Sequence, residues 1–279
     1  MPDEIPVRLG VGEAAAISVV SYLLYVASSL ILFEMLPLKA GAAISSVVLF
    51  TSAYYLVWRA DGRPADYVGL RRLSSRLTLY SVLASLALIP VAASVMAVVM
   101  SYLDIPKAWL DAAYELVRAD DLRGLFFAWV VAALLAAIGE EFIFRGVLQN
   151  SLASRYASWV AVLIASIVFG VLHVWRFPAA FILGAFLGSL YAVTGTLVAP
   201  IVAHVTINSV VVIGSFLLDR AEPGSLPDWI AEDAPAPVLL LVLSGAVFAL
   251  FMALILRASR SRHPTDPEKD HVSGPNGTE

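Results

Sequence analysis

The chain alternates between long apolar stretches and short polar segments. Eight stretches carry few or no charged residues. At about 1.5 Å per helical residue, they approach or exceed the roughly 30 Å hydrocarbon core of a bilayer. Breaks containing proline, glycine or arginine separate them, as expected at helix ends. The pattern predicts eight membrane-spanning helices at residues 14–35, 40–58, 77–103, 124–154, 159–175, 178–193, 197–218 and 238–258.

These spans predict the all-α class, in the form of a polytopic membrane bundle, because helices satisfy their own backbone hydrogen bonds in lipid. In the sixth span Gly184 and Gly188 form a GxxxG pair, which indicates close helix packing. The predicted organisation is a cytoplasmic N-terminus, three accessory spans with their loops, a core of spans four to seven, a loop with the eighth span, and a disordered cytoplasmic tail. The corresponding residues are 1–13, 14–123, 124–218, 219–258 and 259–279.

Composition supports this class and excludes others. Hydrophobic residues make up 60% of the 279 residues and charged residues 14%, which is not the composition of a soluble domain. The formal net charge is −4 and no basic stripe occurs, so no nucleic-acid partner is expected. Cysteine is absent, which removes disulfides, thiolate metal sites and cysteine nucleophiles.

The distribution of lysine and arginine predicts the orientation. An even number of spans places both termini on one side of the membrane. Eleven Lys and Arg residues fall on that side and six on the other, with Arg145 left out because it lies within a span. Positively charged loops are retained in the cytoplasm. Both termini are therefore predicted to be cytoplasmic, in a multi-pass protein of the cell membrane.

The fourth predicted span carries three ionisable residues, Glu140, Glu141 and Arg145. Charge at membrane depth is costly, so the group indicates either a functional site or a buried structural ion network. Glu141 and Arg145 are four residues apart and share a helix face, in the order that favours an ion pair. Glu140 lies about 100° further round the helix. It is predicted to stay without a local partner, available as a general base.

Three further polar side chains, His173, His204 and Asn208, lie in the later spans. Glu140 and His173 stand at similar distances from a predicted turn at 155–158, so they are expected at similar depth on antiparallel neighbouring helices. His204 and Asn208 are four residues apart and point the same way. One such residue alone is usually an interhelical hydrogen-bond partner. Three of them near a free carboxylate favour a site.

No motif singles out a nucleophile. HExxH, GxGD and GxSxG are absent, which argues against site-2-type zinc proteases, presenilin-type proteases and serine hydrolases with a nucleophile elbow. Two arrangements remain open. In one, Glu140 activates a water that His173 orients, and His204 and Asn208 donate hydrogen bonds to the oxyanion. In the other, Glu140, His173 and His204 bind a catalytic zinc that keeps an open position for water.

Three motifs occur in order, each on its own predicted span. They read Glu140-Glu141-x-x-x-Arg145, Phe169-x-x-x-His173 and His204-x-x-x-Asn208. This order resembles the CPBP family, which comprises CAAX prenyl endopeptidases of the Ras-converting type and bacteriocin-processing or self-immunity membrane proteases. The resemblance covers residues 125–218, about a third of the chain.

The resemblance implies an eight-helix bundle that hydrolyses peptide bonds inside the membrane, with its catalytic core in spans four to seven and a cavity open to the cytoplasm. It implies that Glu140 is the base and that His173 positions the water. His204 and Asn208 are implied as the oxyanion donors. The supporting residues that it implies are Glu141, Arg145 and Phe169, the last as part of the cavity wall.

Members of this family have been described both as metalloproteases and as metal-independent glutamate proteases. No cofactor is favoured for this chain, because Asn208 is a poor zinc ligand and yet shares a helix face with His204. An oxyanion pair explains both residues, whereas a zinc site explains only one. Zinc held by Glu140, His173 and His204 stays the alternative.

The expected substrate is a lipidated or membrane-bound peptide cut near its C-terminus, prenylated and of CAAX type in one branch of the family. Two other functions stay open. One is a transporter or channel whose relay includes Glu140 and Arg145, although no convincing inverted repeat supports it. The other is an inactive immunity or scaffold protein, which the intact motifs argue against.

Overall fold

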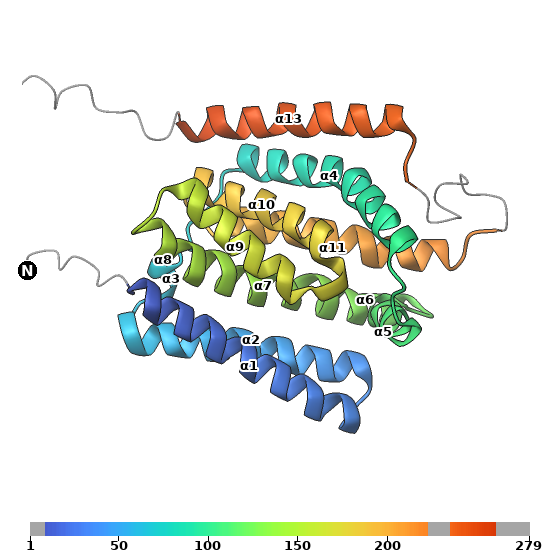
Figure 1. Ribbon diagram of the computed structural model, residues 1–279, viewed down its shortest axis with the longest axis horizontal. Coiled ribbons are helices and arrows are strands. Elements are labelled where there is room, and N and C mark those ends of the chain that lie inside the picture. Colours follow the sequence, from blue (N-terminus) through green and yellow to red (C-terminus); the bar gives the residue numbers. More distant parts are fainter. Residues whose placement is uncertain (1–8, 223–234, 261–279) are drawn as a thin grey trace, which may run out of the picture.

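The computed structural model describes residues 9–222 and 235–260, and every regular element in those ranges is helical (Figure 1). The predicted all-α class is confirmed. Parts of the predicted N-terminal segment, of the loop before the last span and of the tail lie outside the described residues. The elements are α1 (Val11–Met35), α2 (Leu38–Asp61), α3 (Pro64–Tyr67), α4 (Ser75–Tyr102), α5 (Lys107–Val117), α6 (Leu122–Ala128), the π-helical η1 (Trp129–Leu135), α7 (Ala136–Glu141), the π-helical η2 (Phe142–Gln149), α8 (Asn150–Ala153), α9 (Ser158–Leu172), the 3₁₀ turn η3 (Val174–Arg176), α10 (Phe177–Thr194), α11 (Val198–Leu218) and α13 (Val238–Arg260).

Seven helical stretches in the described residues are long and apolar enough to cross a membrane. Six are α1, α2, α4, α11, α13 and α10 together with η3, and the seventh is the continuous helix at 122–153. They correspond to seven of the eight predicted spans. The prediction of a polytopic membrane bundle is confirmed.

The fifth predicted span, residues 159–175, is shorter than expected. Helix α9 holds 15 residues, about 22 Å of helix, and η3 then leads directly into α10. His173 caps α9 with φ −89° and ψ 2°, and Val174 follows with a positive φ of 53°. A positive φ is an outlier for a β-branched residue, and such strain concentrates at functional sites. His173 therefore lies at a sharp break rather than inside a full-length helix.

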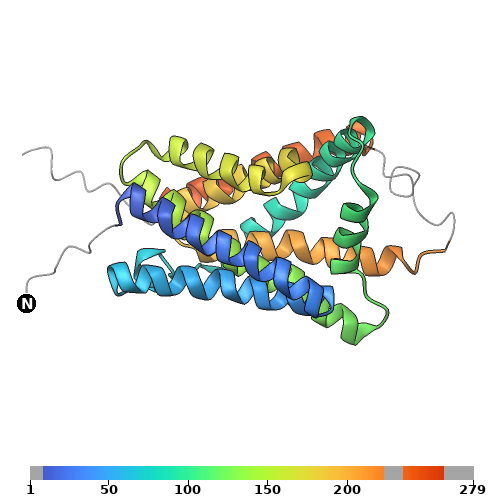
Figure 2. The same cartoon turned by 60° about the horizontal axis from the view of Figure 1, so that its bottom comes forward.

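In the view of Figure 1 the helices form three groups that lie side by side, and Figure 2 shows the blue pair, α1 and α2, from a second direction. Helices α1 and α2 pack together on one side, and α4 packs with α13 on the other. The helices from α6 to α11 lie between these two pairs. Helix α1 begins and α13 ends at the same end of the bundle (Figure 1), as the predicted topology requires. Two outer pairs thus enclose the segment that carries all the candidate site residues.

Burial is distributed as in a protein solvated by lipid. Ser21, Ser45 and Ser81 are fully buried, whereas Leu30 and Met35 are 68% and 73% exposed. Lipid tails solvate large apolar side chains, so the hydrophobic effect does not drive these inward, and small residues let the helices approach one another closely. The exposed apolar surface is therefore the expected lipid-facing surface.

The GxxxG pair of α10 serves close packing, as predicted. A Cβ atom added to Gly184 would lie 3.2 Å from Cα of Ser166 on α9, and one added to Gly188 would lie 2.7 Å from Oε1 of Gln149. The Gly184 and Gly188 carbonyls also accept hydrogen bonds from Arg145 and Gln149. The pair therefore fixes α10 against α9 and against η2.

We expect Gly184→Ala to destabilise the protein by about 1–3 kcal/mol, because backbone rather than a flexible side chain opposes the new methyl group. Thermal unfolding in detergent measures the change. Gly214→Ala on α11 is the matched control, since its Cβ would meet nothing within 4 Å and alanine favours a helix. Equal effects of the two substitutions would contradict the packing role of Gly184.

Candidate active site

The two glutamates lie on α7, an α-helical segment between the π-helical segments η1 and η2. Together with α6 and α8, these segments form one continuous helix of 32 residues, from Leu122 to Ala153. The overlong fourth span is therefore confirmed. π-helical turns are rare and are found frequently at functional sites, and here one lies on each side of the Glu-Glu pair.

The predicted ion pair of Glu141 and Arg145 is confirmed. Nη1 of Arg145 donates to Oε1 of Glu141 at 3.0 Å, and both side chains are almost completely buried. Nη2 of Arg145 donates to the Gly184 carbonyl at 3.1 Å. The guanidinium also lies 4.6 Å from the ring centroid of Phe169. Because a buried carboxylate needs a positive partner, Arg145 compensates the charge of Glu141 and ties this helix to α10.

A second contact of Glu141 was not predicted. Nδ1 of His204 lies 2.7 Å from Oε1 of Glu141. An ionised carboxylate only accepts hydrogen bonds, so Nδ1 must carry the proton. The second ring nitrogen, Nε2, lies 3.9 Å from Oε2 of Glu140. Glu141 therefore orients the imidazole of His204 so that Nε2 faces Glu140.

Glu140 differs from its neighbour in both exposure and partners. Its side chain is 24% exposed, whereas that of Glu141 is fully buried. Among the described residues, none donates a hydrogen bond to Glu140, and Arg145 pairs with Glu141 instead. The prediction of a carboxylate without a local partner is confirmed. Such a carboxylate is accessible to water and to a substrate.

His173 is placed by its own helix end. Its Nδ1 lies 2.7 Å from the Phe169 carbonyl, which can only accept a hydrogen bond, so Nε2 is the free ring nitrogen. No hydrogen bond joins His173 to Glu140 in the described part of the chain. The structure therefore brings His204, rather than His173, into direct contact with the glutamate pair.

Phe169 connects the two histidines. Its ring centroid lies 4.3 Å from that of His173 and 6.1 Å from that of His204. The side chain is fully buried, and its role as part of a cavity wall stays a prediction. It is buried because α9 packs against α10 and η2, and the ring contacts both imidazoles.

Asn208 shares α11 with His204, one turn further on. Its Nδ2 donates to the Ala132 carbonyl in η1 at 3.0 Å. A carboxamide nitrogen carries two hydrogens, so one N–H remains for another acceptor. The π-helical segment η1 therefore orients the amide of Asn208. The i, i+4 spacing of His204 and Asn208 could not predict this contact.

Sequence reasoning missed two tyrosines on α1. Tyr22 and Tyr25 both lie within electrostatic range of Glu140, and the Tyr22 hydroxyl is 3.4 Å from the carbonyl of Leu172, the residue before His173. Their spacing of three residues in an apolar span was the available signal. Helix α1, one of the predicted accessory spans, therefore lies beside the glutamate pair and the end of α9.

The candidate zinc ligands do not assemble into a metal site. No group of three His, Asp or Glu side chains suited to a metal ion occurs among residues 9–222 and 235–260. Glu140 and Nε2 of His204 are close, whereas His173 forms its ring contact with Phe169 and its Nδ1 hydrogen bond with the Phe169 carbonyl. The arrangement provides two ligands where a catalytic zinc site has three.

The fold and the site define a polytopic membrane protein with a carboxylate–imidazole centre inside its helical bundle. Residues 122–210 match the family model described as type II CAAX prenyl endopeptidase Rce1-like, and the resemblance indicated by the motifs is confirmed. The matched segment contains every candidate site residue that the motifs supplied. No curated protein and no solved structure matches the chain. The family match indicates a membrane-embedded peptidase that acts on membrane-associated substrates.

Proposed function

We propose that this protein is an intramembrane endopeptidase that hydrolyses a peptide bond near the C-terminus of a membrane-bound, CAAX-type prenylated peptide. One observation carries the proposal. The accessible carboxylate of Glu140 faces Nε2 of His204, and the buried Glu141 holds that imidazole in place. An oriented imidazole beside a free carboxylate is suited to moving a proton to or from water.

The attacking water is proposed to lie between Glu140 and His204. The 3.9 Å between Oε2 and Nε2 is too long for a direct hydrogen bond and suits a bridging water. Glu140 accepts a proton from this water as its oxygen attacks the scissile carbonyl carbon. His173, with Nε2 free, accepts a hydrogen bond that orients the same water.

The resulting oxyanion is proposed to be stabilised from α11. The second N–H of Asn208 is available, because Ala132 occupies only one. His204 contributes a second donor from Nε2 when its ring is protonated. Glu140 then delivers its proton to the leaving amine as the C–N bond breaks, which returns the carboxylate. Preorganised donors of this kind are typically the largest contribution to acyl-transfer catalysis.

We favour a mechanism that uses no metal. Among the described residues, no group of three side chains suited to a metal ion occurs, and a zinc site would leave the proposed oxyanion role of Asn208 unexplained. Zinc bound by Glu140, His173 and His204 remains the alternative mechanism.

The test is cleavage of a quenched prenylated CAAX peptide by purified full-length protein, with and without a strong zinc chelator. We expect the rate to be unchanged by the chelator. Loss of activity that zinc restores would contradict the metal-free mechanism. Absence of cleavage of this and other membrane peptides by folded protein would contradict the proposed activity and leave transport or a non-proteolytic immunity role.

A further inference from the structure

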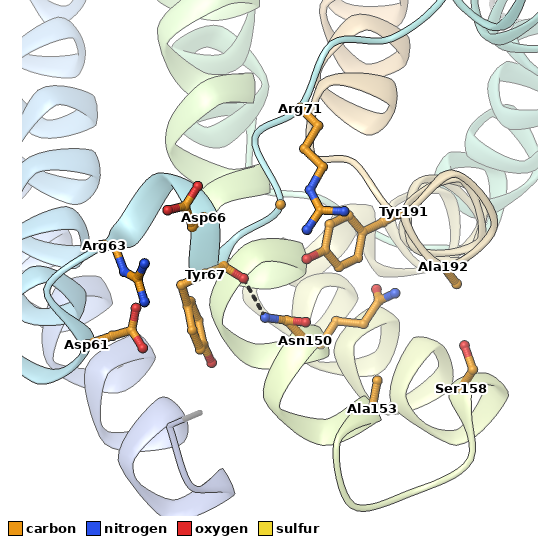
Figure 3. Close-up of a pocket in the computed structure, with 13 residues that line it drawn as sticks. Asp61, Arg63, Asp66, Tyr67, Arg71, Asn150, Ala153, Ser158, Tyr191 and Ala192 are labelled. Atoms are coloured by element: carbon orange, nitrogen blue, oxygen red, sulfur yellow. Dashed lines mark hydrogen bonds between the residues drawn. The ribbon is translucent and has the colours of Figure 1, made fainter. Parts of the chain in front are cut away.

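A cavity lies away from the glutamates, at the end of the bundle where α1 begins. It has a volume of about 540 Å³ and opens among the segment after α2, the α8–α9 turn and the end of α10. Figure 3 shows Asp61 and Arg63 on one side of this space and Arg71 and Tyr191 on the other. Gln149 also lines it, eight residues beyond Glu141, or about 12 Å along the helix. The cavity is therefore separate from the active site.

The charged side chains around this cavity have both signs. Arg63 and Arg71 are basic, and Asp61 and Asp66 are acidic. Among the described residues, none of these four side chains forms a hydrogen bond or an ion pair within the protein. The cavity therefore offers two free cations and two free anions to a ligand, and a ligand of a single charge would satisfy only half of them.

The buried residue of the cavity needs a hydrogen-bond donor. Gln149 is only 2% exposed, and its Nε2 donates to the Gly188 carbonyl at 2.8 Å. Its Oε1 atom has no partner. A buried acceptor without a donor costs free energy, and a ligand with an N–H or O–H group removes that cost. This requirement favours ligands that carry a hydrogen-bond donor over purely anionic ones, and the two aspartates of the cavity favour a donor that is also a cation.

The position of the cavity indicates where the ligand comes from. The same end of the bundle exposes the aromatic residues Trp58, Tyr156 and Trp159 to between 45% and 70%. Exposed tryptophan and tyrosine mark the level of lipid headgroups, and clustered arginines at that level attract phosphates. The cavity therefore opens where phospholipid headgroups lie.

We propose that this cavity binds the headgroup of a zwitterionic phospholipid with a primary ammonium group, that is, of the phosphoethanolamine type. Arg63 and Arg71 contact the phosphate. Asp61 and Asp66 accept hydrogen bonds from the ammonium, and Oε1 of Gln149 accepts another. A choline headgroup has no N–H donor, and a glycerol headgroup has no cation for the aspartates. The proposal does not depend on the peptidase activity.

The test is native mass spectrometry of the purified full-length protein, equilibrated with equal amounts of phosphatidylethanolamine, phosphatidylcholine and phosphatidylglycerol that share the same acyl chains. We expect phosphatidylethanolamine to be retained about five- to tenfold better than either competitor. Asp61→Asn/Asp66→Asn is expected to abolish the preference over phosphatidylcholine. Arg63→Gln/Arg71→Gln is expected to abolish specific retention of phosphatidylethanolamine.

The matched control is Arg72→Gln/Arg76→Gln, which removes the same charge from two exposed arginines outside the cavity and is expected to keep the preference. Equal retention of the three lipids would overturn the proposal, as would better retention of phosphatidylglycerol. Displacement of the bound lipid by soluble glycerophosphoethanolamine would support headgroup recognition. Binding of the soluble compound without any retention of the lipid would overturn the assignment to a lipid.

Discussion

Replacing Glu140 by glutamine is expected to lower the cleavage rate by about 10²–10⁴-fold, the usual contribution of a general base. The substitution keeps the shape of the side chain and removes its ability to take a proton from water. Because Glu140 has no hydrogen-bonded partner among the described residues and is partly exposed, its folding role is small. The measurement is peptide cleavage by purified variants, with thermal unfolding recorded in parallel.

Glu34→Gln provides the control for charge removal. Glu34 is exposed near the end of α1, outside the site, and its substitution is expected to leave cleavage unchanged. If Glu140→Gln unfolds at the same temperature as the unsubstituted protein and still cleaves at the same rate, Glu140 is not the base. His204 or His173 would then have to act as the general base.

Arg145→Leu is expected to lower the stability of the fold by about 3–5 kcal/mol, the typical effect of removing one member of a buried ion pair. It leaves the Glu141 carboxylate without its cation and removes the hydrogen bond to the Gly184 carbonyl. Chemical unfolding in detergent measures the loss. The matched comparison is Lys107→Leu, which removes an i, i+4 pair with Asp111 whose side chains are mostly exposed and is expected to change stability little.

The double substitution Glu141→Leu/Arg145→Leu separates stability from activity. Replacing both members of a buried pair by apolar residues is often neutral, so much of the stability is expected to return. Activity is expected to stay low, because Nδ1 of His204 loses the acceptor that orients its ring. A double variant that recovered full activity would show that Glu141 does not position His204.

The sequence by itself determined what depends on local spacing. Apolar runs of membrane-spanning length define helices, since no other continuous segment can satisfy its backbone in lipid. The i, i+4 spacing of Glu141 and Arg145 was sufficient for their ion pair, because both side chains belong to one helix face. The same reasoning left Glu140 without a local partner. These features need no knowledge of how the helices pack.

Tertiary structure decided which faces meet. The contact between Glu141 and His204 joins residues 63 positions apart. It depends on the packing of α11 against α7 and on the π-helical turns that change the phase of the long helix. The same phase change explains why Asn208 reaches the Ala132 carbonyl. Helical periodicity assumes about 3.6 residues per turn and therefore cannot place side chains beyond a π segment.

Two further features were also decided only by packing. The break at His173 shortens α9, because Val174 adopts a positive φ that no local rule assigns to valine. The tyrosines of α1 lie within electrostatic range of Glu140 because α1 packs against η2. Apolar periodicity determines that a helix spans the membrane, whereas its neighbours, its ends and its rotation depend on the side chains that it meets across the bundle.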